Sequence, residues 1–266
     1  MGREFIWLFL RSTLFAVGLI LSTVVYALLM PFTFAFAYSI RYRFVRHWSR
    51  FNLWWLKVTC QLSYEVKGLE NIPSTPAVVL AKHQSTWETL ALQHLFIPQI
   101  WVVKRELLWV PFFGWSLAML RPIAINRQAG RRAVQQVIEQ GCRRLDSGSY
   151  VVIFPEGTRV APGTRKRYQL GGALLAERSG YAIVPVAHNA GEFWPRRSFI
   201  KRPGTISLVI GPIIESVGRQ ASELNQLVEA WIEGEVARIG NPHLEALEQR
   251  VSESTPRART CSVENT

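Results

Sequence analysis

Apolar and polar positions divide the chain into an apolar amino-terminal segment and a longer mixed part. From Ser12 to Ile40, twenty-nine consecutive residues carry no charged side chain. A helix needs only about 20 predominantly apolar residues to cross a bilayer, so this segment is predicted to enter a membrane. Pro31 interrupts it and leaves two forms open, either one kinked span or two shorter helices that enter one leaflet and return.

A secretory signal peptide is the competing explanation of the same segment. Arg3 and Arg11 precede the apolar run, and Ala35-Phe36-Ala37 resembles a small-residue cleavage site. The run is, however, much longer than the usual signal core of about 7 to 15 residues. Lys and Arg side chains follow it closely, so the positive-inside rule predicts that the following domain lies on the cytoplasmic face. These cations are at positions 41, 43, 46, 50 and 57. We expect the membrane to be the inner membrane of the cell.

After Tyr64, short apolar runs alternate with helical stretches. The runs are almost continuously hydrophobic, which predicts strands that are buried on both faces. Strands that alternate with helices indicate an α/β domain whose sheet is largely parallel or mixed and is flanked by helices. The predicted strands are 77–81, 100–103, 150–154, 182–187 and 206–210, and the predicted helices are 85–95, 128–145, 172–179 and 222–238.

The same pattern divides the chain into three regions. Residues 1–44 are predicted to form the membrane anchor, and residues 45–250 are predicted to form one α/β domain. Residues 251–266 are polar and show no apolar periodicity, so they are predicted to be a disordered tail.

The charge balance indicates an anionic partner. The chain has 31 Lys and Arg against 19 Asp and Glu, a net charge of +12. Ten Trp, fourteen Phe and a positive mean hydropathy favour anionic membrane lipids over nucleic acid. The cysteines, Cys60, Cys142 and Cys261, lack the spacing of zinc ligands or of a disulfide framework. We therefore expect no metal site and no bound cofactor.

The first candidate for chemistry is His83, which follows the predicted strand 77–81. Strand carboxyl ends form the ligand-binding edge of α/β sheets. If a helix begins at Ser85, the carboxylate of Glu88 can hold one ring nitrogen of His83 and leave the other to accept a proton from a hydroxyl. The competing explanation is a capping box, in which Glu88 only reaches back to the helix start.

The second candidate segment is Phe154-Pro155-Glu156-Gly157-Thr158-Arg159, which follows the predicted strand 150–154. A glycine allows the backbone to approach a ligand closely, and the guanidinium of Arg159 is a two-pronged donor suited to phosphate. Taken alone, the segment is equally compatible with an ordinary turn that carries a solvated arginine.

Together, in this order and about seventy residues apart, the two segments resemble the blocks of the glycerolipid acyltransferases that make phosphatidic acid from lysophosphatidic acid. The resemblance implies catalytic roles for His83 and Glu88, and substrate-binding roles for Glu156, Gly157, Thr158 and Arg159. Lys104 and Arg127 lie in a stretch that resembles the block with which the family holds the glycerol phosphate. A solvated or lipid-facing charge is the alternative for these two residues.

The resemblance implies that a fatty acyl group moves from a thioester, either acyl-CoA or acyl carrier protein, to the sn-2 hydroxyl of lysophosphatidic acid. One position departs from the pattern, because Glu88 stands where most members have Asp. The His-x4-Glu form also resembles the acyltransferases that complete lipid A, so acylation of a lipid A precursor or of a lyso-ornithine lipid is an alternative. A non-catalytic protein that binds the membrane surface is a third reading.

Overall fold

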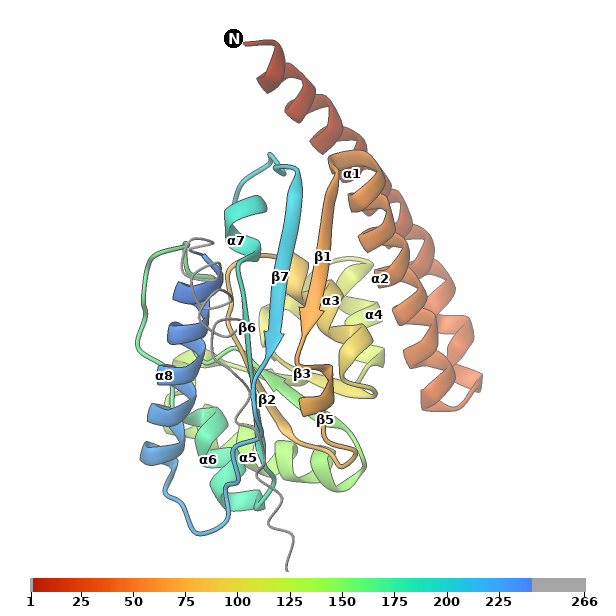
Figure 1. Ribbon diagram of the computed structural model, residues 1–266. Helices are drawn as coiled ribbons and strands as arrows, with labels where there is room; N and C mark the ends of the chain where they lie inside the picture. The colour runs from red at the N-terminus through yellow and green to blue at the C-terminus, as the bar shows by residue number, and fades with distance from the viewer. Residues whose placement is uncertain (1, 241–266) are drawn as a thin grey trace, which may run out of the picture.

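A computed structural model describes residues 2–240, so the predicted tail and Cys261 lie outside the described residues. Within that range one mixed sheet of seven strands forms in the order β1-β7-β6-β2-β5-β3-β4 (Figure 1). The five predicted strands are present, whereas β1 and β4 were not predicted. The strands are β1 (Leu62–Lys67), β2 (Val78–Ala81), β3 (Gln99–Lys104), β4 (Ile123–Ile125), β5 (Tyr150–Ile153), β6 (Ile183–His188) and β7 (Gly204–Ile210).

Strand direction brings the candidate segments to one edge of the sheet. β2 pairs in parallel with β5 and β6, β3 pairs in parallel with β5 and β4, and only β6 and β7 pair antiparallel. The carboxyl ends of β2, β5, β3 and β4 therefore point the same way, and the residues that follow these strands lie near one another. β1 and β7 run in the opposite direction, which makes the sheet mixed.

Helices cover both faces of the sheet (Figure 1). The four predicted helices are present, with ends shifted by no more than about three residues, a normal uncertainty for helix ends. The helices α2 (Tyr38–Cys60), α4 and α7 were not predicted. The helices after the amino-terminal pair are α3 (Trp87–Leu95), α4 (Phe113–Met119), α5 (Arg131–Asp146), α6 (Gly171–Ser179), α7 (Ala190–Phe193) and α8 (Ala221–Ile239).

Each face of the sheet carries its own apolar core. Along β2, Val79 packs in a core with Leu56 of α2 and Trp87 of α3, whereas Val78 packs in a second core with Leu224 of α8. All four residues of β2 are buried. This alternation confirms that the continuously apolar runs are strands with both faces covered.

The amino-terminal segment folds into two helices that lie side by side (Figure 1). α1 (Arg3–Leu29) continues as a 3-10 helix (Met30–Ala35) with Pro31 in its first turn, and α2 (Tyr38–Cys60) runs back along α1. The helices approach closely at Gly18, where an added Cβ would meet the indole of Trp55 at 2.1 Å. The predicted boundary between residues 44 and 45 falls inside α2.

α1 is long and apolar, and it also contacts the domain. The stretch Arg3–Ala35 is long and apolar enough to cross a membrane, and an 18-residue window within it reaches a mean hydropathy of 2.2. Near its start, the hydroxyl of Ser12 accepts a hydrogen bond from the N–H of Lys201 at 2.9 Å. The ring of Phe15 packs edge-on against Trp194. The helix pair is therefore packed onto the α/β domain.

Candidate active site

His83 and Glu88 are brought together at the carboxyl end of β2. α3 begins at Trp87, two residues later than predicted, so His83 lies in the connection that precedes the helix. Glu88, in the first turn of α3, reaches back toward this connection. Its Oε1 accepts a hydrogen bond from Nδ1 of His83 at 2.8 Å. With His83 before the helix and Glu88 in its first turn, two residues that are five positions apart can meet, and the carboxylate can orient the imidazole.

The carboxylate of Glu88 also holds the backbone. It accepts hydrogen bonds from the N–H groups of Gln84 at 3.0 Å and Ser85 at 2.8 Å. Burial is the largest influence on this carboxyl and favours its neutral form, but the rings of His188 and His83 and the Ser85 N–H outweigh it. The pKa of Glu88 consequently lies below its ordinary value. Glu88 therefore combines the capping contact with the contact to the imidazole.

Stacked aromatic side chains fix the plane of the His83 ring. The ring stacks on Phe154 with centroids 3.9 Å apart, and Phe154 in turn stacks on Trp101. Since Nδ1 carries the hydrogen that it donates to Glu88, Nε2 is the acceptor nitrogen. No residue between 2 and 240 forms a hydrogen bond with Nε2. This nitrogen is thus free to accept a proton from a bound hydroxyl.

The second candidate segment is hydrogen-bonded to the first. The N–H of Val160 donates to the carbonyl of His83 at 2.8 Å, and the N–H of His83 donates to Oε2 of Glu156 at 3.1 Å. Glu156 is only 1% exposed, and burial raises its pKa to about 7 against the opposing effect of Lys82. The predicted substrate-binding residue Glu156 therefore lies beneath the His83 connection and not in the cavity.

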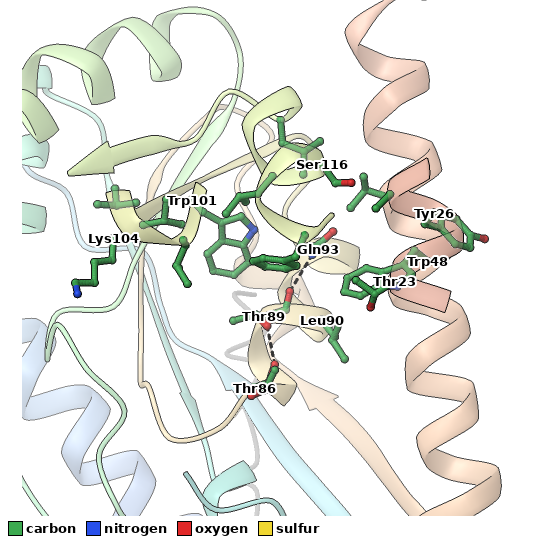
Figure 2. Close-up of a pocket in the computed structure, with 18 of the residues that line it drawn as sticks. Thr23, Tyr26, Trp48, Thr86, Thr89, Leu90, Gln93, Trp101, Lys104 and Ser116 are labelled. Atoms are coloured by element: carbon green, nitrogen blue, oxygen red, sulfur yellow. Dashed lines mark hydrogen bonds between the residues drawn. The ribbon is translucent and has the colours of Figure 1, made fainter. Parts of the chain in front are cut away.

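A cavity of about 300 Å³ opens beside His83. One side of it is apolar and includes Leu19 and Ala27 of α1 and Leu117 of α4. In Figure 2, Lys104 lies on one side of the cavity and Thr23 and Tyr26 of α1 lie on the other, with Trp101 between them. The cavity thus extends from the sheet edge to the amino-terminal helices.

Cationic residues line the His83 side of the cavity. Lys104, Arg127 and Arg159 contribute to its lining, whereas Glu156, Gly157 and Thr158 do not. Arg127 donates a hydrogen bond to the carbonyl of Gly157 and so ties the end of β4 to the second segment. Arg159 is half-buried and forms no salt bridge within residues 2–240. Its guanidinium is available for an anionic group in the cavity.

Sequence reasoning gave no role to two residues that support His83. Phe154 was noted only as the start of its segment, although its ring packs on the imidazole. His188, at the end of β6, is fully buried, and its Nε2 donates to the carbonyl of Lys82 at 2.8 Å. The position of each at a strand end is the signal that could have indicated them. Residues 2–240 contain no cluster of His, Cys, Asp or Glu side chains that could hold a metal ion.

Comparison with known proteins gives consistent matches. The Acyltransferase family matches residues 63–189. A protein of Pseudomonas aeruginosa named 1-acyl-sn-glycerol-3-phosphate acyltransferase is 48% identical over 82% of this chain and 85% of that protein. A Saccharomyces cerevisiae protein of the same name is 30% identical over 49% of this chain and 44% of that one.

A solved structure has the same fold. The crystal structure of PlsC from Thermotoga maritima, described as a 1-acyl-sn-glycerophosphate (LPA) acyltransferase, has a TM-score of 0.73 and 22% sequence identity. The match covers 87% of this chain and 95% of that one. It therefore includes most of the α/β architecture described above.

Proposed function

Because this chain belongs to the 1-acyl-sn-glycerol-3-phosphate acyltransferase family, as its 48% identity with the Pseudomonas aeruginosa protein shows, we propose a specific reaction for it. The enzyme moves a fatty acyl group from a thioester donor to the sn-2 hydroxyl of lysophosphatidic acid and so produces phosphatidic acid. Because the family consists of enzymes, the alternative that the chain is a non-catalytic binding protein is no longer needed. The observation that carries the proposal is the His83–Glu88 pair beside a cavity that is cationic near His83 and apolar beyond it.

In this mechanism His83 is the general base. Nε2 accepts the proton of the sn-2 hydroxyl while that oxygen attacks the thioester carbonyl carbon. The carbon–sulfur bond then breaks, and the imidazolium returns the proton to the departing thiolate. Glu88 keeps the hydrogen on Nδ1 and stabilises the imidazolium between the two steps. The acyl group passes directly from donor to acceptor, without a covalent enzyme intermediate.

The two parts of the cavity suit the two parts of an acylated glycerol phosphate. Arg159 can donate two parallel hydrogen bonds to the phosphate, and Lys104 adds a point charge. Arg127 already donates to Gly157 and acts mainly by holding that loop in place. The apolar lining from α1, α2 and α4 is chemically suited to a hydrocarbon chain. Acyl-CoA and acyl carrier protein both supply the required thioester.

A panel of acceptors, assayed with one thioester donor, tests the substrate assignment. We expect the wild-type enzyme to acylate lysophosphatidic acid in preference to a lyso-ornithine lipid or a lipid A precursor. Arg159→Lys should raise the KM for lysophosphatidic acid about ten- to a hundredfold, because a lost charge-assisted contact costs about 1.5–3 kcal/mol. The KM for the donor should stay nearly unchanged. Initial rates over a grid of both substrates measure these values.

Arg131→Lys, an exposed change on α5, is the matched control and should have wild-type constants. If Arg159→Lys instead raised only the KM for the donor, Arg159 would belong to the donor side, because both donors also carry phosphate. Equal or faster acylation of the lyso-ornithine lipid would contradict the assignment of a phosphate-bearing acceptor.

We further propose that the α1–α2 pair inserts into one leaflet at the cytoplasmic face of the inner membrane. α2 lies along α1 and carries Arg43, Arg46 and Arg50, which a full crossing of α1 would draw into the hydrocarbon region. These cations can instead remain at the level of anionic lipid head groups. The outer side of α1 is apolar and exposed, which suits burial in acyl chains.

Membrane attachment can be tested by changing that outer side. Leu10, Leu14 and Leu21 lie on one face of α1 and are each at least half exposed. Removing a leucine side chain from water contributes about 1.5–3 kcal/mol, so replacing all three by Ser should move much of the protein into the soluble fraction after membrane sedimentation. Wild-type protein should stay attached in high salt, since salt weakens only the electrostatic part of the attachment.

The control replaces Leu170, Val217 and Leu227, which are exposed on other parts of the domain, by Ser. This variant should sediment with membranes as the wild type does. Release of the wild type by salt alone would show that the attachment is electrostatic and that α1 does not insert.

A further inference from the structure

A group of buried charges lies next to the His83 connection and outside the cavity lining. Lys82 directly precedes His83 and is 1% exposed. Its Nζ lies 3.0 Å from Oε1 of Glu156 and 2.5 Å from Oε1 of Glu233. Glu233 belongs to α8, more than 150 residues further along the chain. None of these three residues contributes to the cavity lining.

The group is connected to the backbone of His83 at two points. Lys82 is bonded covalently to His83, so the ion pairs of its side chain hold the chain immediately before the imidazole. On the other side, the Glu156 carboxylate accepts the His83 N–H at 3.1 Å. A continuous series of contacts therefore runs from Glu233 through Lys82 and Glu156 to His83. A base must be held close to its productive position, because even small displacements reduce the rate.

Glu233 forms the shorter of the two ion pairs of Lys82, 2.5 Å against 3.0 Å for Glu156, and its second oxygen lies 3.8 Å from the exposed Arg165. A buried ammonium is costly unless it is well paired, so loss of Glu233 leaves Lys82 with Glu156 alone and frees its side chain to shift. Tyr168 donates at 2.8 Å to Oε1 of Glu233, the oxygen that pairs with Lys82, and fixes the carboxylate further. Burial, followed by the charges of Glu156 and Glu233, raises the pKa of Tyr168, so the phenol keeps the hydrogen that it donates.

We propose that Glu233 is a positioning residue of the active site, which holds His83 in place through the buried side chains of Lys82 and Glu156. Glu233 lies outside the part of the chain that the Acyltransferase family matches, residues 63–189. The inference rests on the proposed function, because it takes His83 as the base. It makes the carboxy-terminal helix α8 part of the catalytic apparatus.

Glu233→Gln, made in the full-length membrane-bound enzyme, tests the inference. We expect kcat to fall about ten- to a hundredfold, the range for a base displaced by an ångström or less. The KM values for both substrates should be nearly unchanged, because no cavity-lining residue is altered. Glu223→Gln on the same helix is the control. Glu223 is exposed and pairs with Arg219 at 3.7 Å on the surface, so its loss should leave kcat at the wild-type value.

A double variant distinguishes positioning through Lys82 from a separate effect of Glu233. If Glu233 acts through Lys82, then Glu233→Gln should cause little further loss of kcat once Lys82→Gln is present. The decrease in kcat of the double variant should equal that of the less active single variant. Losses that multiply would show two independent effects and would overturn the inference.

Tyr168→Phe decides the question if Glu233→Gln does not fold. It removes one hydrogen bond to Glu233 and should lower kcat about two- to tenfold with unchanged KM. Wild-type kcat in that folded variant would contradict the inference.

His83→Ala distinguishes failure of the proposed function from failure of the role of Glu233. Full activity of His83→Ala would remove the proposed function itself, whereas an inactive His83→Ala with a fully active Glu233→Gln would remove only the role of Glu233.

Discussion

Replacing His83 with Ala should lower kcat about 10²- to 10⁴-fold, the range for loss of a general base. The imidazole is the group whose free Nε2 can take the hydroxyl proton, and its Nδ1 is already engaged by Glu88 at 2.8 Å. The measurement is the rate of acyl transfer to lysophosphatidic acid under saturating concentrations of both substrates.

Membrane sedimentation and the thermal midpoint of the same His83→Ala preparation are the controls. Both should remain close to wild type, because the removed ring stacks on Phe154 at the rim of the cavity and does not belong to either apolar core. Wild-type turnover in a folded His83→Ala enzyme would exclude the mechanism, whatever the reaction.

Glu88→Gln should lower kcat roughly 10²- to 10⁴-fold, the size of effect expected when a histidine loses the carboxylate that sets its tautomer. The Gln carbonyl can still accept from the N–H of Ser85. Its amide group, however, donates to Nδ1 and moves the imidazole hydrogen to Nε2, where it blocks the base. Steady-state kinetics combined with a thermal melt separate loss of chemistry from loss of fold.

Glu88→Asp keeps the charge and should retain more activity than Glu88→Gln. The shorter side chain has to reach from the first turn of α3 to Nδ1, so some loss is expected here too. Full activity of Glu88→Gln at normal stability would show that Glu88 only caps the helix start through Gln84 and Ser85.

The strands that were predicted and those that were missed differ in their surroundings. β2 and β5 are buried at every residue and read as unbroken apolar runs. β1 lies at an edge of the sheet, and its sequence, Leu-Ser-Tyr-Glu-Val-Lys, is half polar. β4 has only three residues. Neither strand contains an apolar run long enough to be recognised from hydrophobic periodicity.

α2 was missed for a different reason. Its arginines follow the apolar segment closely, and the positive-inside rule uses them only to assign the cytoplasmic side of the membrane. The structure shows that the same residues form one helix, whose inner side includes Leu53 and Leu56 in the core. The outer side of α2 carries charged residues together with exposed Trp54 and Val58, and the sequence prediction uses only the charges.

In the candidate site too, some features could be predicted from the sequence and others could not. His83 and Glu88 were predicted because their spacing and their place after a strand limit how they can meet. Glu156 points into the protein because it pairs with Lys82, which also pairs with Glu233 of α8. No local sequence pattern specifies a contact with so distant a residue. The cavity depends in the same way on tertiary packing, since α1, α2, α4 and the sheet edge all contribute to its lining.

α1 has a consequence for how a lipid substrate meets the enzyme. Tyr26 and Ala27 line the cavity, whereas Val25 and Leu28, in the same turn, are exposed on the outside. At this turn α1 alone therefore separates the cavity from the proposed bilayer, while α2 and α4 line other parts of the cavity. A long acyl chain that crossed water would lose about 0.8 kcal/mol for each exposed methylene. If α1 inserts as proposed, a lipid substrate can pass from the bilayer to the cavity without crossing water, and release of the enzyme from the bilayer would remove both this supply of substrate and the lipid contact that supports α1.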